Sequence, residues 1–173
     1  MSAIAYIGIG SNDGARLHNC RTALNFIGQD NEIEVKRVSM WYESEALSPS
    51  GAPSDQRNYI NGVVEIVTEL GARELLSYLL ATEVKMGRPR TRPKGKPRTI
   101  DLDLLLYGTC VIDEEGMVVP HPALAKRMFV LTPLCDIAPG AVEPRTGLTA
   151  RQMADACSVA TPQRITHLGE HAC

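Results

Sequence analysis

The sequence is poor in the features that mark several large classes of protein. Only 5% of its 173 residues are aromatic, and no apolar run approaches the roughly 18 residues that a membrane-spanning helix needs. The five cysteines are odd in number, scattered and without a Cys-x-x-Cys pair, which is typical of reduced thiols rather than of a disulfide framework. The first residues lack the pattern of a signal peptide. We therefore expect a cytoplasmic protein that does not bind membranes.

What remains is an ordinary globular composition. Hydrophobic residues make up 44% of the chain and charged residues 22%. A length of 173 residues predicts a single domain that covers residues 1–173, with a weakly patterned tail after about residue 162. The net charge of −2 argues against nucleic acid as the main partner of the whole chain.

Hydrophobic periodicity predicts the order strand, helix, strand, strand, helix, strand, followed by smaller additions. The expected strands cover residues 4–9, 32–42 (with a bulge near residue 37), 59–68 and 99–107, and the expected helices cover 17–27 and 72–86. This order is typical of an α+β protein with a ferredoxin-like antiparallel sheet and packed helices, in three layers α-β-α. Further helices are expected near residues 127–137 and 152–157.

Local signals add detail to these helices. Asn12 or Asp13 could cap the first helix. The second helix should turn an apolar stripe inward, formed by Leu75, Leu76, Leu79, Leu80 and Val84. Glu83 falls on the same stripe, and an inward carboxylate needs a partner, either a neighbouring arginine or a ligand.

The most informative stretch is a basic loop that runs into a strand with two carboxylates. The loop holds six cations and no acid, at Arg88, Arg90, Arg92, Lys94, Lys96 and Arg98. In the strand that follows, Asp101 and Asp103 are two residues apart and so project from the same face. Carboxylates hold hard cations, and arginines neutralise phosphoryl oxygens. The junction therefore predicts a site for a magnesium-bound polyphosphate, in which two cations could share the carboxylates.

The residue types at this junction are also compatible with other functions. The two acids could simply face solvent, or could form the nucleophile motif of an aspartyl-phosphate phosphatase, although that motif needs a loop where the strand continues. The basic loop could be a solvated charge run or a nucleic-acid patch, but it has no aromatic residue to stack on bases.

Two short motifs imitate other functions. Gly8-Ile-Gly10-Ser-Asn-Asp-Gly14 follows a strand, like a dinucleotide fingerprint, but its third glycine is one place late. His167-Leu-Gly-Glu-His171 matches an inverted zinc-protease motif, but no downstream third ligand follows in this sequence and Gly169 weakens a helix. We expect neither function.

Two of the few aromatic residues suggest a site for a planar ligand. Tyr59 lies two residues before Asn61 at the start of a strand, and Phe129 follows Arg127. Two rings and an amide would suit a heterocycle, with stacking on its faces and hydrogen bonds on its edge. Packing in the core is the alternative.

Taken together, these residues resemble the 6-hydroxymethyl-7,8-dihydropterin pyrophosphokinase family of folate biosynthesis. The likeness runs from about Ala5 to Pro139. It rests on Tyr6-Ile-Gly-Ile-Gly-Ser-Asn12, Tyr59-Ile-Asn61, Gly87-Arg88-Pro-Arg90, Pro97-Arg98-Thr-Ile-Asp101-Leu-Asp103, Val119-Pro-His121-Pro and Arg127-Met-Phe129-Val-Leu-Thr-Pro-Leu134.

The resemblance implies a ferredoxin-like fold and an enzyme that transfers pyrophosphate from ATP to the hydroxymethyl group of the pterin, releasing AMP. It implies that Asp101 and Asp103 hold two Mg²⁺ ions, with Arg88 and Arg98 also catalytic. The residues it assigns to ATP are Glu83, Arg88, Arg90, Arg98, Leu104, His121 and Arg127. The residues it assigns to the pterin are Ser44, Leu47, Tyr59, Asn61 and Phe129. We expect a monomer whose partners are small molecules.

The chain departs from the family pattern at the loop and near the nucleotide. Gly95 replaces a tryptophan and Lys94 an arginine, Glu45 replaces a proline, and Leu80 and Gly116 stand where polar or basic residues occur. These changes concern lid closure and nucleotide binding more than chemistry. The main alternative function is a non-catalytic homologue that binds pterin or nucleotide.

Overall fold

A computed structural model describes residues 2–46, 54–88, 96–160 and 163–171. The elements follow the predicted order. The strands of the main sheet are β1 (Ala3–Ser11), β2 (Ile33–Val38), β3 (Met40–Ser44), β4 (Tyr59–Thr68), β5 (Asp101–Tyr107) and β8 (Ile165–His171). The helices are α1 (Arg16–Ile27), α2 (Ala72–Lys85), α3 (Met128–Ile137) and α4 (Ala150–Ala160), with a 3₁₀ turn at Leu124–Lys126. A small hairpin, β6 (Ile112–Glu114) and β7 (Met117–Val119), completes the described elements.

The main sheet is antiparallel in all its pairings. Its strands follow the order β5-β1-β4-β3-β8, and β2 pairs with the other half of β4. Ser39 lies between β2 and β3 in the chain. Its Oγ accepts a hydrogen bond from the backbone N–H of Val63 in β4 at 2.9 Å. The single strand expected over residues 32–42 is therefore two strands beside β4, and the predicted bulge lies between Val35 and Arg37.

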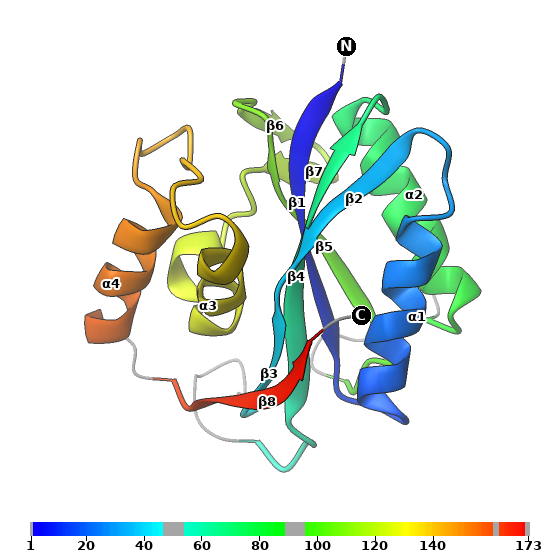
Figure 1. The fold of residues 1–173 in the computed structure, drawn as a ribbon, viewed down its shortest axis with the longest axis vertical. Coiled ribbons are helices and arrows are strands. Elements are labelled where there is room, and N and C mark those ends of the chain that lie inside the picture. Colours follow the sequence, from blue (N-terminus) through cyan, green and yellow to red (C-terminus); the bar gives the residue numbers. More distant parts are fainter. Residues whose placement is uncertain (1, 47–53, 89–95, 161–162, 172–173) are drawn as a thin grey trace.

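The sheet separates two hydrophobic cores, as the predicted three layers require. Helices α1 and α2 cover one face, and α3 and α4 cover the other (Figure 1). Alternation decides the face: Ile7 and Ile9 of β1 pack toward α1 and α2, whereas Tyr6 packs toward α3. The α+β antiparallel prediction is confirmed.

Two local predictions need correction. Leu80 and Val84 of α2 are 50% and 41% exposed and Thr82 is buried instead, whereas Glu83 is buried as predicted. The first helix begins after Ala15, without a side-chain cap from Asn12 or Asp13, and Oδ1 of Asn12 instead accepts a hydrogen bond from the backbone N–H of Arg98.

Within the described chain, no helix is long and apolar enough to cross a membrane.

The tail is the largest correction. Residues 165–171, expected to be weakly patterned, form β8 and pair with β3 at the edge of the sheet (Figure 1). Local sequence patterns indicate this strand only weakly, because Gly169 interrupts its alternation and its backbone hydrogen bonds go to a strand more than a hundred residues away.

Candidate active site

The carboxylate pair lies on the edge strand β5, where alternation places it as predicted. Leu102 and Leu104 are buried in the core under α1 and α2. Asp101 and Asp103 project from the opposite face, which α3 partly covers. Glu83 of α2 borders this strand, since its carboxylate accepts a hydrogen bond from the backbone N–H of Leu102 at 2.7 Å.

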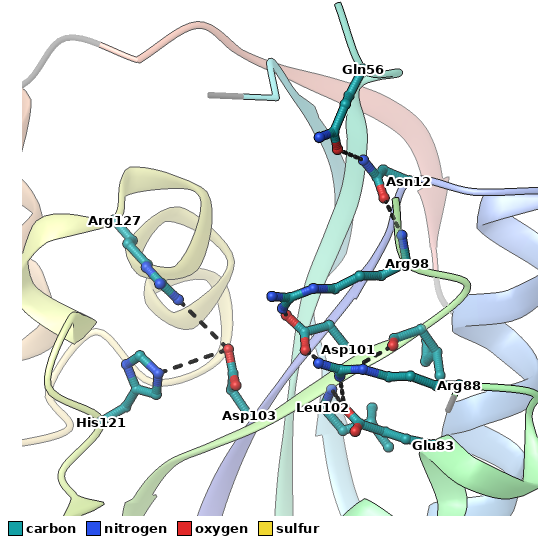
Figure 2. A network of polar contacts seen from close by, with 11 residues as sticks. Asn12, Gln56, Glu83, Arg88, Arg98, Asp101, Leu102, Asp103, His121 and Arg127 are labelled. Carbon is teal, nitrogen blue, oxygen red and sulfur yellow. Dashed lines mark hydrogen bonds and ion pairs between the residues drawn. The ribbon is translucent and has the colours of Figure 1, made fainter. Parts of the chain in front are cut away.

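Asp101 is held by two arginines. Its Oδ1 accepts a hydrogen bond from Arg88 and its Oδ2 accepts one from Arg98, each at 2.5 Å. Arg88 also donates to Glu83, so a chain of alternating charges runs from α2 to β5 (Figure 2). Glu83 was predicted to need an arginine or a ligand as partner, and the arginine is Arg88.

Glu83 is an unusual member of this chain of charges. Burial is the main reason that its pKa is raised to about 7, while the Leu102 N–H and Arg88 pull the value down. A carboxyl with this pKa changes its charge near neutral pH. The hold of Glu83 on Arg88 therefore weakens when the pH falls below neutrality.

Asp103 faces a different pair of side chains. Nε2 of His121 lies 3.9 Å and Nη1 of Arg127 lies 3.7 Å from its Oδ2, on the side away from Arg88 (Figure 2). Burial first, and then the charge of Asp101, raise the pKa of Asp103. Because burial disfavours the ionised form of Asp103, a positive charge beside it would stabilise that form.

His121 is oriented by its own backbone. Its Nδ1 accepts a hydrogen bond from the N–H of Ala123 at 3.1 Å, and burial lowers the pKa of the ring. A neutral imidazole that accepts at Nδ1 carries its proton on Nε2. His121 therefore presents an N–H toward Asp103 and the cavity beside it.

A cavity of about 550 Å³ opens over this face of the sheet. It brings together most of the residues predicted from the sequence. From the predicted pterin set it is lined by Ser44, Tyr59, Asn61 and Phe129, and from the predicted phosphate and metal set by Arg98, Asp101, Asp103, His121 and Arg127.

Two glycines of β1, Gly8 and Gly10, form part of the floor of the cavity. In the central strand β1, Gly10 pairs with Asn61 on one side and Asp101 on the other, and Gly8 pairs with Asp103. A Cβ on Gly10 would lie 3.4 Å from Oδ1 of Asn61 and 3.9 Å from Cβ of Asp101. The glycines that imitate a dinucleotide fingerprint thus leave open the space between the amide and the carboxylates.

The wall of the cavity away from Asp101 and Asp103 is formed mainly by neutral polar and aromatic side chains, with Glu45 as a charged lining residue. Nδ2 of Asn61 donates to Oγ of Ser44 at 2.8 Å, and both residues are buried. Burial raises the pKa of Tyr59, which keeps its hydroxyl protonated. The guanidinium of Arg127 lies 5.7 Å from the ring centre of Phe129, so a cation–π contact joins the neutral part of the site to the charged part.

A second cavity, of about 340 Å³, runs along the open edge of β5. It is lined by α2, β7 and β5, and includes Glu83, Arg88 and Leu104 from the predicted nucleotide set. Leu80 and Gly116 lie on it too, at the two positions where the chain departs from the family pattern. Asp101, Asp103 and His121 line both cavities, so the carboxylates stand at the boundary between them.

Two predicted site residues, Leu47 and Arg90, lie outside the described residues, as does most of the basic loop. Two further residues belong to the site but were not predicted as such. Asn12 is buried and bonded to the backbone of Arg98, and Gln163 lines the larger cavity. The motif around Asn12 was a signal for the first, whereas nothing in the tail indicated the second.

Magnesium suits this donor set. Among the described residues there is no group of three or more acidic, histidine or cysteine side chains that could enclose a metal. Two carboxylates on one face, beside arginines that attract phosphate, match an ion that is bound by one or two carboxylates together with substrate phosphates.

Comparison with known proteins adds independent evidence. A family profile for 7,8-dihydro-6-hydroxymethylpterin-pyrophosphokinase (HPPK) matches residues 6–139. The chain is 43% identical to the 2-amino-4-hydroxy-6-hydroxymethyldihydropteridine pyrophosphokinase of Synechocystis sp., over 86% of this chain and 73% of that protein. It is 38% identical to the enzyme of the same name from Haemophilus influenzae, over 87% and 93% of the two chains.

Some relatives are much longer. The folic acid synthesis protein fol1 of Schizosaccharomyces pombe is 40% identical over 83% of this chain, which corresponds to 19% of fol1. Among solved structures, a triple mutant of HPPK-DHPS from Plasmodium falciparum, crystallised with pteroate, matches 92% of this chain and 44% of that protein with a TM-score of 0.71. At 13% identity, this likeness supports the fold alone.

Proposed function

Because the chain belongs to the HPPK family, we propose that it transfers the pyrophosphoryl group of ATP to the hydroxymethyl group of 6-hydroxymethyl-7,8-dihydropterin and releases AMP. The product is an activated pterin for folate biosynthesis. The observation that carries the proposal is the pair of adjoining cavities with Asp101, Asp103 and His121 at their boundary. A group that passes from one substrate to another needs such a shared boundary.

The larger cavity is the proposed pterin site. Tyr59 and Phe129 supply aromatic surface for the ring, and Asn61 and Ser44 supply polar atoms for its edge. These four side chains are neutral, which suits a neutral heterocycle. The backbone near Ser44 would add hydrogen-bonding groups, as the resemblance implies.

The smaller cavity and the basic residues beside it are the proposed ATP site. Glu83, Arg88 and Leu104 line it, while Arg98, His121 and Arg127 reach toward the boundary from the larger cavity. Arg90 would join them from the loop. Asp101 and Asp103 would hold two Mg²⁺ ions, which supply charge neutralisation for the phosphates.

The site residues must change partners when ATP binds. Arg88 and Arg98 both contact Asp101 in the substrate-free chain. Phosphate oxygens offer the arginines a new anionic partner and leave the oxygens of Asp101 to a metal. The exchange keeps the positive and negative charges balanced in both states.

The reaction itself needs little chemistry from the protein. The pterin hydroxyl oxygen forms a bond to the β-phosphorus and its proton passes to solvent water, while the bond from this phosphorus to the oxygen it shares with the α-phosphate breaks. The electron pair stays on that oxygen, so AMP is the leaving group. Arginines and the Nε2–H of His121 stabilise the phosphoryl charge, and positioning does the rest. No covalent enzyme intermediate is required.

Nucleotide analysis tests the proposal directly. The purified protein is incubated with Mg-ATP, with and without the pterin, and nucleotides are separated by chromatography. We expect AMP only when the pterin is present. ADP instead of AMP would show attack at the other phosphorus, and pterin binding without any nucleotide change would favour the non-catalytic binder.

A single domain, a monomeric state and a cytoplasmic location remain predictions from the sequence. Sedimentation analysis of the purified chain tests the monomer, with and without substrates. A steep, salt-dependent affinity for DNA or RNA would instead revive the nucleic-acid reading of the basic loop.

A further inference from the structure

One buried polar atom in the larger cavity has no partner among the described residues. Gln163 lines the cavity, and its Oε1 is shielded from solvent, yet no described residue donates a hydrogen bond to it. Buried carboxamide oxygens are normally satisfied by a donor. The atom is therefore available to a donor on whatever molecule fills the cavity.

The last strand brings Gln163 to this position. In the β3–β8 pairing, Ile165 lies opposite Ser44 and Thr166 lies opposite Glu43. Opposed residues of an antiparallel pair project to the same face, and the face repeats every second residue. Gln163 precedes β8 by two residues and lines the cavity together with Ser44 (Figure 1 shows β8 beside β3).

The neighbouring polar groups are already partly used. Oγ of Ser44 accepts a hydrogen bond from Nδ2 of Asn61. Gln163 therefore adds a second carboxamide acceptor beside Oδ1 of Asn61, on the side of the cavity away from Asp101 and Asp103, where Glu45 is the charged lining residue. A neutral acceptor suits a ring N–H or an amino group of a neutral heterocycle.

We propose that Gln163 is a specificity residue for the pterin, whose edge donates a hydrogen bond to Oε1 of Gln163. The inference rests on the proposed function for the identity of the ligand. Gln163 lies outside residues 6–139, the segment that matches the family. The C-terminal strand thus completes the pterin site with a contact that is absent from the matched segment.

Substitutions at Gln163 separate recognition from folding. Gln163→Leu keeps much of the side-chain volume but removes the acceptor, and Thr166→Ala, an exposed position in the same strand, is the matched control. With a non-hydrolysable ATP analogue present, we expect Gln163→Leu to raise the Kd for the pterin about tenfold, which corresponds to about 1.4 kcal/mol. The KM for ATP and the thermal midpoint should stay close to those of the wild type and of Thr166→Ala.

Gln163→Glu provides a second variant, because it keeps an acceptor oxygen in nearly the same shape. It should weaken pterin binding less than Gln163→Leu does. An unchanged pterin Kd in Gln163→Leu would overturn the proposal. A parallel loss of pterin affinity, ATP affinity and thermal stability would also overturn it, since that pattern belongs to a residue that only supports the wall.

Pterin analogues locate the hydrogen bond. Each analogue lacks one donor, either the exocyclic amino group or one ring N–H. One deletion should weaken binding to the wild type but have no further effect in Gln163→Leu, because the contact is already lost. Fully additive losses for every analogue would contradict the contact.

The test also distinguishes this inference from the proposed function. If the wild type binds the pterin but forms no AMP, the proposed function fails and the binding experiments still decide the role of Gln163. If the wild type forms AMP and Gln163→Leu binds the pterin normally, the inference fails by itself. Absence of pterin binding in the wild type would overturn both.

Discussion

Oδ1 of Asn12 accepts a hydrogen bond from the backbone N–H of Arg98 at 2.7 Å, and the backbone N–H of Asn12 donates to the carbonyl of Arg98 at 3.0 Å. Nδ2 of Asn12 donates to Oε1 of Gln56 and to the carbonyl of Arg57. One buried amide thus joins the end of β1 to two segments distant in the sequence (Figure 2). Arg98, which contacts Asp101, is fixed at its backbone by this residue.

We therefore expect Asn12→Ala to lower kcat about tenfold or more while leaving the Kd for the pterin nearly unchanged, because Arg98 loses its backbone anchor. Stability should fall by about 1–3 kcal/mol, the cost of leaving buried groups without partners. Single-turnover rates and chemical denaturation measure the two effects. Asn12→Asp should restore part of the rate, since it keeps the acceptor.

Asn19→Ala serves as the control for this experiment. Asn19 donates to Oγ of Ser11, the last residue of β1, and to the carbonyl of Asp13, whereas the hydrogen bonds to the backbone of Arg98 come from Asn12. It should leave kcat close to the wild-type value. Equal rate losses in the two variants would show that the loop as a whole matters, rather than the anchoring of Arg98.

Removal of either carboxylate should abolish transfer. Asp101→Ala and Asp103→Ala are each expected to reduce kcat about a thousandfold or more, because each carboxylate is a proposed metal ligand and a metal supplies several kcal/mol of charge stabilisation. The pterin Kd, measured by fluorescence titration, should change little. Asp113→Asn is the control, since its side chain is 75% exposed on β6. Near-normal turnover in either alanine variant would refute the assignment.

Two glycines in neighbouring strands should respond differently to one added methyl group. Gly10→Ala would project a Cβ into the cavity floor at ordinary contact distances, so we expect the pterin Kd to rise about tenfold, or about 1.4 kcal/mol, with little loss of stability. In Gly62→Ala the Cβ would lie 2.5 Å from the ring of Trp41, which is fully buried. We expect that variant to lose about 1–3 kcal/mol of stability.

Binding titrations and thermal melts of both variants test this pair of expectations. Gly8→Ala is a third variant for comparison in the same strand, because the nearest atoms to its Cβ would belong to the side chain of Leu105, at 3.5 Å. Full pterin affinity in Gly10→Ala would show that the ligand does not occupy the floor between Asn61 and Asp101.

Glu83 should make the substrate-free protein less stable as the pH rises from about 4.5 to about 7. The unfolded chain ionises this group near its usual pKa of 4.5, whereas burial raises the folded pKa to about 7. Unfolding therefore releases a proton in this range, and a higher pH favours it. The effect amounts to at most about 3 kcal/mol.

Glu83→Gln removes this titration and should flatten the dependence of unfolding free energy on pH between about 4.5 and 7. Urea denaturation at a series of pH values, without metal or nucleotide, measures it. Glu74→Gln, at an exposed position of the same helix, should keep the wild-type slope. Identical slopes in wild type and Glu83→Gln would show that Glu83 ionises at its usual pKa in the folded protein.

Local patterns in the sequence determined much of the architecture and the centre of the site. The strand at Tyr59–Thr68 has the predicted bounds, because alternation and β-branched residues act over a few neighbours. The shared face of Asp101 and Asp103 follows from the period of a strand alone. The HPPK likeness then indicated which distant residues would join them, and most of the described ones line the two cavities.

Only the tertiary structure decided the rest, because these features depend on contacts between distant segments. The inward face of α2 includes Thr82 rather than Leu80, and the backbone N–H that Glu83 accepts from comes from the edge strand β5. The glycines of β1 became a cavity floor only when β4 and β5 flanked them. Residues 165–171 form a strand because they pair with the edge strand β3, and this pairing places the neighbouring Gln163 at the cavity.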